Sequence, residues 1–305
     1  MRGPDLQRSA AVSSALGTAA VALLWGTSGA LVRHLALPAA EIACLRAALG
    51  ALTLAIWLSL RRGAAGTTKA TNRYLPSLVL SGVLLAAHWL TFVMALQRAP
   101  IGTVLTGIYL APIVIALLAY RTLGERVGRT KAIAVLVAVG GSALVLRPGV
   151  AGGWGGVSLT LFSAVAYAGS ILASKKALRA VAPAVVAAGQ LGVTALVLAP
   201  LLLVDFAPVS LPDAAVLSAL GIVYSAVAMM AYLASLRGIS TTSSAILLCL
   251  EPVSGFITGW IALDEHPSPL TAVGAVTVLA AGAFATLKAA EEDHPLPEDQ
   301  IAARR

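Results

Sequence analysis

Apolar stretches alternate with short polar connections along almost the whole chain. Ten of them approach or reach the length of about 20 residues that a helix needs to cross the hydrocarbon core of a bilayer. Proline and glycine punctuate the connections. The pattern therefore predicts an all-α integral membrane protein with ten transmembrane helices. The predicted spans are residues 11–33, 40–60, 75–96, 103–120, 131–146, 155–173, 184–204, 214–236, 243–263 and 270–287.

The composition agrees with a membrane protein and disfavours a soluble one. Hydrophobic residues make up 59% of the 305 residues and charged residues only 11%, whereas a soluble domain carries about 25% charged residues. Both cysteines, Cys44 and Cys249, lie inside apolar stretches, so we expect them to pack in the core and not to form a disulfide or bind a metal. We expect no cofactor.

The basic residues that give the net charge of +8 are distributed as expected for the two sides of a membrane and do not indicate a binding surface. Basic residues form short clusters between apolar stretches, without a basic stripe interleaved with aromatic residues, so we expect no nucleic-acid partner. With a cytoplasmic N-terminus, 17 of the 21 Lys and Arg residues fall in cytoplasmic segments, and only Arg33, Arg98 and Arg147 fall in outer connections. The positive-inside rule then predicts an inner-membrane protein with both termini in the cytoplasm.

The chain repeats itself at an offset of 140 residues. Each half holds five predicted helices, and because five is odd, the second half must enter the membrane with opposite polarity. Such inverted repeats are typical of secondary transporters, whose substrate site lies near the membrane midplane. We therefore predict a cytoplasmic N-terminal segment at 1–10, a first five-helix repeat at 11–149, an inverted second repeat at 150–290 and a disordered cytoplasmic tail at 291–305. The coinciding pairs are Leu96 with Leu236, Leu110 with Leu250, Pro112 with Pro252, Leu123 with Leu263, Glu125 with Glu265, Ala132 with Ala272 and Ala143 with Ala283.

Several short motifs in this order resemble the EamA-type repeat of the drug/metabolite transporter superfamily. The resemblance spans about residues 12–288 and implies ten helices in two inverted halves, a central cavity and export of small metabolites. It is strongest toward the amino-acid exporters, with the aromatic amino-acid branch as one candidate. The second half departs from the pattern at Tyr167-Ala168 and at Gln190. The motifs are Trp25-Gly26, Leu45-Arg46, Pro112 with Leu123-Gly124-Glu125-Arg126, Leu250-Glu251-Pro252 and Leu263-Asp264-Glu265.

Glu251 is the most informative candidate site residue. It lies within an apolar stretch long enough to span a bilayer, where an ionisable group is costly and usually faces a cavity or a partner. Glu251 could bind and release a proton, or bind an ammonium group together with a backbone carbonyl that Pro252 leaves without its helical donor. The alternative is that Glu251 pairs with a neighbouring Ser, Thr or Tyr and only stabilises packing.

Aromatic residues and one histidine supply further candidates for the substrate site. His88 could donate to a carboxylate and Trp89 offers a stacking face, although adjacent helical residues point about 100° apart, so we expect only one of them to face the cavity. The alternative is a packing histidine and a lipid-facing tryptophan. A tyrosine at membrane depth needs a polar partner, so we expect some of Tyr109, Tyr167, Tyr224 and Tyr232 to line the cavity. The family motif adds Trp25.

The other charged residues at helix ends suggest structure more than substrate binding. Glu41 and Arg46 are about 7.5 Å apart along one helix, so we expect them to pair or to extend outward; a clamp for a substrate carboxylate is the alternative for Arg46. Glu125 and Glu265 lie at predicted helix ends, where we expect caps or gates.

The sequence therefore predicts a transporter that exports amino acids or related small metabolites across the inner membrane by alternating access. Its expected partners are a small-molecule substrate, the lipid bilayer and, as a candidate coupling ion, the proton. A proton-coupled exporter of organic cations remains an alternative. An intramembrane enzyme is a remote one, because four scattered His and two separate Cys do not form a recognisable catalytic pattern.

Overall fold

Every regular element in the described part of the chain is a helix. The computed structural model describes residues 4–61, 68–108, 110, 111, 114, 118, 129–145, 152–204, 206–241, 244 and 247–292. The α-helices are α1 (Pro4–His34), α2 (Ala39–Leu60), α3 (Thr68–Leu96), α4 (Ile101–Ile108), α6 (Arg129–Val145), α7 (Gly153–Ala177), α8 (Pro183–Leu198), α9 (Leu211–Ala219), α10 (Ala228–Gly238), α12 (Glu251–Leu263) and α13 (Pro269–Glu292). Two 3₁₀ turns, η2 (Ala199–Leu203) and η4 (Leu248–Leu250), and a π-helix, η3 (Leu220–Val227), complete the list.

Six helical segments in the described residues are long and apolar enough to cross a membrane. They include α1, α2, α3 and α7, the continuous α8–η2 segment, and the continuous α9–η3–α10 segment. The other predicted spans coincide with α4, α6, α12 and α13, whose described apolar parts are shorter. The all-helical class and the membrane character are therefore confirmed, while the count of ten stays a prediction.

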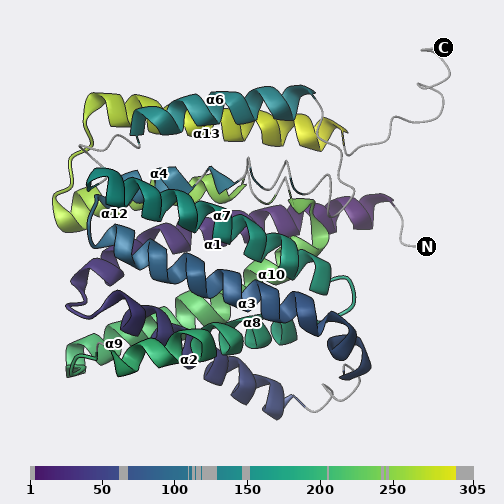
Figure 1. Cartoon of the computed structure of the whole chain (residues 1–305). Helices are drawn as coiled ribbons and strands as arrows, with labels where there is room; N and C mark the ends of the chain where they lie inside the picture. The colour runs from purple at the N-terminus through teal and green to yellow at the C-terminus, as the bar shows by residue number, and fades with distance from the viewer. Residues whose placement is uncertain are drawn as a thin grey trace.

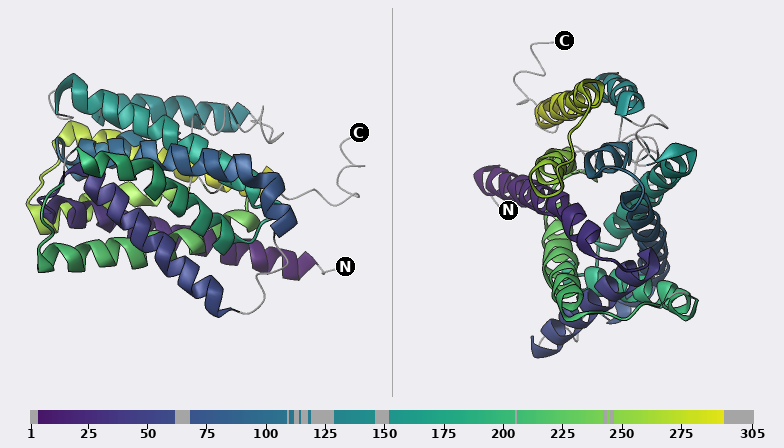
Figure 2. Two further views of the ribbon diagram at one scale, coloured as in Figure 1. Left: turned by 60° about the horizontal axis from the view of Figure 1, so that its bottom comes forward. Right: turned by 90° about the vertical axis from the view of Figure 1, so that its left-hand side faces the viewer.

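The helices run side by side and surround a common interior (Figure 1). The end-on view in Figure 2 shows this arrangement, with α6 and α13 lying together at one edge of the molecule. α3 packs against both α7 and α8, α2 packs against α8, and α1 packs against α10 and α12. Elements from both halves of the sequence therefore contribute to the interior.

Local sequence signals fix several helix ends. The Ser210 hydroxyl accepts the backbone N–H of Asp213 at 3.2 Å and so caps α9, and Pro183 occupies the first turn of α8, where its missing N–H costs nothing. Gly152 and Gly153 have φ of 70° and 76°, the left-handed region that favours glycine. They make the turn that leads into α7.

Some predicted boundaries differ from those observed. α1 begins at Pro4, so the described part of the predicted 1–10 segment is helical, and α13 continues to Glu292, two residues into the predicted tail. The rest of that tail, and eight of the 18 residues of the predicted span 103–120, lie outside the described residues. Within the predicted span 214–236, the chain adopts the π-helix η3, which hydrophobic periodicity does not reveal because it adds no polar signal.

α1 and α12 meet backbone to backbone at Gly26. A Cβ at this position would overlap the carbonyl oxygen of Glu251 and would lie 2.9 Å from the backbone nitrogen of Gly255. Any larger residue would therefore push the two helices apart. Gly26 thus sets the position of α1 beside the first residue of α12.

We predict that Gly26→Ala lowers the free energy of unfolding by about 1–3 kcal/mol, the usual range for overpacking a close contact. The measurement is the thermal unfolding midpoint in detergent, followed by tryptophan fluorescence. Gly140→Ala on α6 is the matched control, because an added Cβ there has no atom within 4 Å, and it should leave the midpoint unchanged or slightly raised. Equal midpoints for the two variants would contradict the close contact.

Candidate functional site

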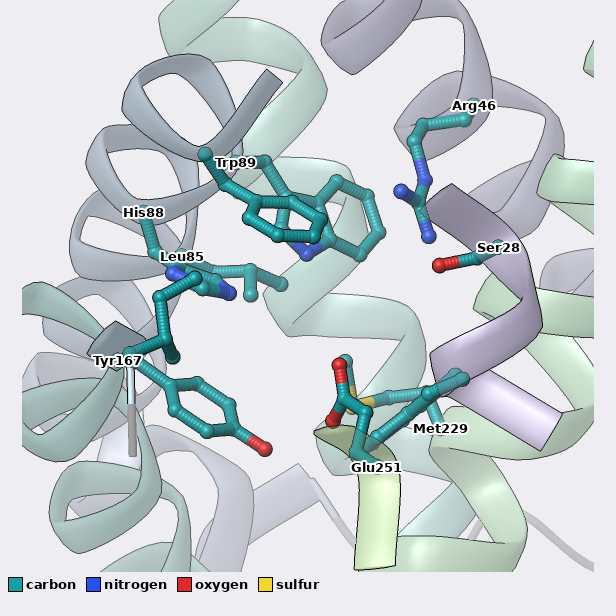
Figure 3. Close-up of a pocket in the computed structure, with 11 residues that line it drawn as sticks. Ser28, Arg46, Leu85, His88, Trp89, Tyr167, Met229 and Glu251 are labelled. Atoms are coloured by element: carbon teal, nitrogen blue, oxygen red, sulfur yellow. The ribbon is translucent and has the colours of Figure 1, made fainter. Parts of the chain in front are cut away.

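A cavity lies in the interior where α1, α2, α3, α4, α7, α10 and α12 converge. It contains about 470 Å³ of space not filled by atoms, a volume that includes solvent space at its open mouth. Charged, aromatic and apolar side chains share its wall (Figure 3). The lining residues are Trp25, Ser28, Arg46, Leu85, His88, Trp89, Phe92, Ile108, Tyr167, Met229 and Glu251.

Arg46 supplies the positive charge of the cavity from α2. Its guanidinium carbon lies 4.0 Å from the centroid of the Trp89 ring, a cation–π contact worth about 2 kcal/mol when desolvated. Its Nε donates to Ser225 Oγ at 3.2 Å, and Ser225 Oγ in turn donates to the carbonyl oxygen of Leu220 at 2.7 Å. Ser225 lies in the π-helix η3, an irregularity that is frequent at functional sites.

The expected pairing of Arg46 with Glu41 is wrong. The side chain of Arg46 is turned into the cavity and is 3% exposed. Glu41 instead accepts the backbone N–H of Ala207 at 2.9 Å and ties the start of α2 to the segment after η2. Residues five positions apart on a helix do not share a face, which is the physical reason that the two side chains diverge.

Glu251 supplies the negative charge and is the first residue of α12. The positive end of the helix dipole favours a carboxylate at this place. Pro252 was expected to leave a carbonyl without a donor. Among the described residues, the carbonyl oxygen of Leu248, four positions before Pro252, instead accepts the Glu251 N–H in the 3₁₀ turn η4.

The two charges face a common interior. Arg46 and Glu251 interact electrostatically, and Tyr167 from α7, Tyr232 from α10 and Cys249 from η4 also lie within the field of Glu251. In the described residues, no three His, Cys, Asp or Glu side chains gather as a set of metal ligands. The polar chemistry of the cavity is thus one cation, one anion and neutral groups.

His88 is held by a reciprocal contact with Ser163 of α7. Ser163 Oγ donates to the His88 carbonyl oxygen at 3.1 Å, and His88 Nδ1 lies 2.8 Å from Ser163 Oγ. Because the serine hydrogen is already used, the network assigns the imidazole hydrogen to Nδ1 and leaves Nε2 as an acceptor. The ring stacks between Phe92, at 5.6 Å, and Tyr167, at 4.6 Å.

Both His88 and Trp89 line the cavity, so the expectation that only one of them would do so is wrong. The alternative of a lipid-facing Trp89 is also wrong, because this side chain is only 6% exposed. The wall curves around α3, and the large indole extends sideways to Arg46 (Figure 3). An angle of 100° between neighbours is therefore compatible with one common cavity.

The candidate tyrosines separate into different environments. Tyr167 lines the cavity, and its buried Oη has no hydrogen-bond partner among the described residues. Tyr224 is not among the lining residues; its hydroxyl bonds with Thr27 Oγ1 at 2.8 Å, and its carbonyl oxygen accepts Trp25 Nε1–H at 2.9 Å. Tyr232 is buried, accepts from Ser244 Oγ at 3.2 Å and contacts the Trp25 ring. Tyr109 lies outside the described residues.

Sequence reasoning did not place several lining residues at the cavity. For Arg46 it gave a substrate clamp only as the alternative, although a charge within an apolar span is itself a signal for an interior position. Ser28 and Met229 gave no such signal, because a small polar residue or a methionine in an apolar span fits packing equally well. Tertiary structure is needed to find residues of that kind.

Basic side chains tie helix ends together at both ends of the molecule. At one end, Arg33 donates to the carbonyl oxygens of Leu96, at 2.6 Å, and Ala99, at 3.2 Å. At the other, Lys175 donates to the carbonyl oxygens of Leu236 and of Ile239, the latter at 2.7 Å. The second pair of acceptors is the first pair shifted by 140 residues. We refer to these as the Arg33 end and the Lys175 end.

Glu265 completes the network at the Arg33 end. Its Oε2 accepts the backbone N–H of Ile101 at 2.8 Å, at the start of α4, and its Oε1 lies 3.5 Å from Arg33 Nη2. The cap expected at Glu265 is confirmed. Its counterpart Glu125 lies outside the described residues.

The chain is similar to one family of transporters in sequence and to a solved structure in fold. The profile of the EamA-like transporter family matches it twice, over residues 12–147 and 154–287. The pseudopaline exporter CntI of Pseudomonas aeruginosa, from strains UCBPP-PA14 and PAO1, is 27% identical over 250 residues, which cover 80% of this chain and 85% of the exporter. A protein crystal structure matches with a TM-score of 0.70 over 90% of this chain and 96% of the other, at 24% identity, and shows a shared fold.

We predict that Glu265→Ala lowers the free energy of unfolding by about 1–2 kcal/mol, because it removes a helix cap and a partly exposed ion pair. Glu265→Gln keeps an acceptor for Ile101 and should lose less. Thermal unfolding in detergent measures both. Asp264→Asn is the control, since Asp264 pairs only with exposed His266 among the described residues; a loss as large as that of Glu265→Ala would refute the cap.

Proposed function

The chain belongs to the EamA-like transporter family, and on this premise we propose that it exports amino acids or related small metabolites across the inner membrane by alternating access. Its family and its apolar helices make it a multi-pass membrane protein that transports small molecules. The similarity to a curated exporter supports the direction of transport. The choice of substrate class rests on the cavity.

The observation that carries the proposal is the presence of Arg46 and Glu251 in one buried cavity. A zwitterion such as an amino acid has a carboxylate and an ammonium group, and these complement the guanidinium and the carboxylate. Arginine binds carboxylates well because its planar fork can make two parallel hydrogen bonds. A single zwitterion would satisfy both protein charges and so offset much of the cost of their desolvation.

Aromatic groups set the shape of the proposed substrate site. Trp89, Tyr167 and Trp25 provide flat apolar surfaces around the two charges, and His88 adds an acceptor. Such a wall fits an apolar or aromatic substrate side chain, in line with the aromatic amino-acid branch as a candidate.

An organic-cation exporter is less well supported. Arg46 is buried in the same cavity as Glu251, so the site carries no net negative charge when both groups are ionised. A cation would approach Glu251 against the repulsion of Arg46. A zwitterion gains from both charges.

The two matches to the family profile support an architecture of two repeats, with ten helices in total. Arg33 and Lys175 each bind a pair of carbonyl oxygens, and the two pairs lie 140 residues apart in the sequence. These equivalent contacts at opposite ends of the molecule support an inverted relation between the halves. The distribution of Lys and Arg supports cytoplasmic termini, which would place the Lys175 end at the cytoplasm. Alternating access would then expose the cavity to one end at a time.

We predict that Arg46→Lys lowers the initial rate of amino-acid exchange by about tenfold or more, because lysine cannot make the bidentate contact or keep the planar stack on Trp89. The measurement is counterflow of a panel of labelled amino acids in proteoliposomes. Arg237→Lys, at the exposed end of α10, is the matched control and should exchange at the wild-type rate. Wild-type exchange by Arg46→Lys for every amino acid would refute the carboxylate role.

We also predict that Glu251→Gln abolishes uphill transport driven by a proton gradient, because the amide cannot bind and release a proton, while downhill exchange survives at a reduced rate. The groups around the carboxylate are Arg46, Tyr167, Tyr232 and Cys249. Substrate accumulation is measured with and without a pH step, after gel filtration has shown a folded variant. Unchanged accumulation with unchanged pH dependence would exclude proton coupling through Glu251.

A further inference from the structure

Polar side chains continue from the cavity toward the Lys175 end, beyond the residues that line the cavity. Ser170 and Ser174 follow Tyr167 at three and seven positions on α7, a spacing that keeps all three on one helix face. Gln190 of α8 reaches this face and donates to Ser170 Oγ at 2.7 Å. We call these four residues the polar seam; it extends about 10 Å along the helix axis from Tyr167 to Ser174.

The polar seam is buried but unsatisfied. Ser170, Ser174 and Gln190 are each no more than 2% exposed. Tyr167 Oη, Ser174 Oγ and Gln190 Oε1 are three of the five buried side-chain atoms in the described residues that have no hydrogen-bond partner. Buried polar atoms without partners are costly and uncommon, so their concentration on one seam requires an explanation beyond packing.

The seam is formed by the counterparts of cavity residues. In the EamA-type pattern that both halves match, Gln190 takes the place of Arg46 and Tyr167 that of Trp25, at offsets of 144 and 142 residues instead of the 140 found for the later helices. If the halves are inverted, positions that line the path toward the Arg33 end have equivalents that line it toward the Lys175 end. Tyr167 fits this relation, because it lines the cavity (Figure 3) and is also the first residue of the polar seam.

We propose that the polar seam lines the second half of the translocation path, closed in this structure, and that water and the polar groups of the substrate occupy it when the Lys175 end opens. The hydrogen bond between Gln190 and Ser170 joins α7 to α8, and in this proposal it holds this half closed. Opening breaks it and exposes the three unsatisfied atoms to water. The inference rests on the proposed transport function but not on the identity of the substrate.

Cysteine accessibility tests the proposal. In a background with Cys44→Ala and Cys249→Ala, single variants Ser174→Cys and Ala173→Cys are treated with a charged, membrane-impermeant methanethiosulfonate reagent in inside-out and right-side-out vesicles. Ala173 is the matched control: it is the adjacent residue, is also buried, and lies about 100° around the helix from Ser174. We expect Ser174→Cys to react about tenfold or more faster than Ala173→Cys, since reaction follows exposure, and only from the Lys175 side.

A further variant tests the closing contact. Gln190→Met keeps the length of the side chain but removes the hydrogen bond to Ser170, so it should raise the labelling rate of Ser174→Cys. Labelling of Ser174→Cys no faster than that of Ala173→Cys from either side, or only from the Arg33 side, would overturn the path. An unchanged rate with Gln190→Met would overturn the closing role.

These outcomes are independent of the amino-acid assays. If no amino acid is transported but Ser174→Cys is labelled as expected, the substrate class is wrong and the path stands. If amino acids are transported but Ser174→Cys is protected like its control, the proposed function stands and the path lies elsewhere.

Discussion

The structure depends on placing two opposite charges in an apolar interior. An isolated buried charge is costly, and a pair is tolerated only where further groups complete its interactions. Arg46 has the Trp89 ring and Ser225 for this purpose, while Glu251 stands at the start of α12, where the helix dipole favours a carboxylate. The π-helix η3 carries Ser225, and the 3₁₀ turn η4 directly precedes Glu251. These two helix irregularities therefore serve the same electrostatic requirement.

The sequence predicted the fold class well and the geometry of the cavity less well. Periodicity and composition were sufficient for an all-helical membrane protein, and the depth of Glu251 in an apolar span placed it at an interior site. The direction of Arg46 was missed because proximity to Glu41 along the chain suggested a pair that the helix does not bring together. Tyr224 was expected at the cavity because a tyrosine at membrane depth needs a polar partner, but its hydroxyl finds that partner within the helix packing, in Thr27.

The two halves share backbone contacts but differ in polar chemistry. Arg33 and Lys175 bind equivalent carbonyl pairs, which indicates that the framework of the helix ends is common to both halves. The interior positions have diverged, with a charged Arg46 in one half and a neutral Gln190 in the other. A neutral seam suits the proposed path of a zwitterionic substrate, because a second fixed charge would hold the substrate there.

The absence of a side chain at Gly26 has a mechanical consequence. The backbones of α1 and α12 are in contact at Gly26, so we expect the segment that carries Trp25 and the segment that carries Glu251 to move together. Any rocking motion of the transporter would move this aromatic ring and this carboxylate together and would shear instead against α2, which bears Arg46. The distance between Arg46 and Glu251 would then vary through the transport cycle, and the hold on the proposed zwitterionic substrate would loosen with it.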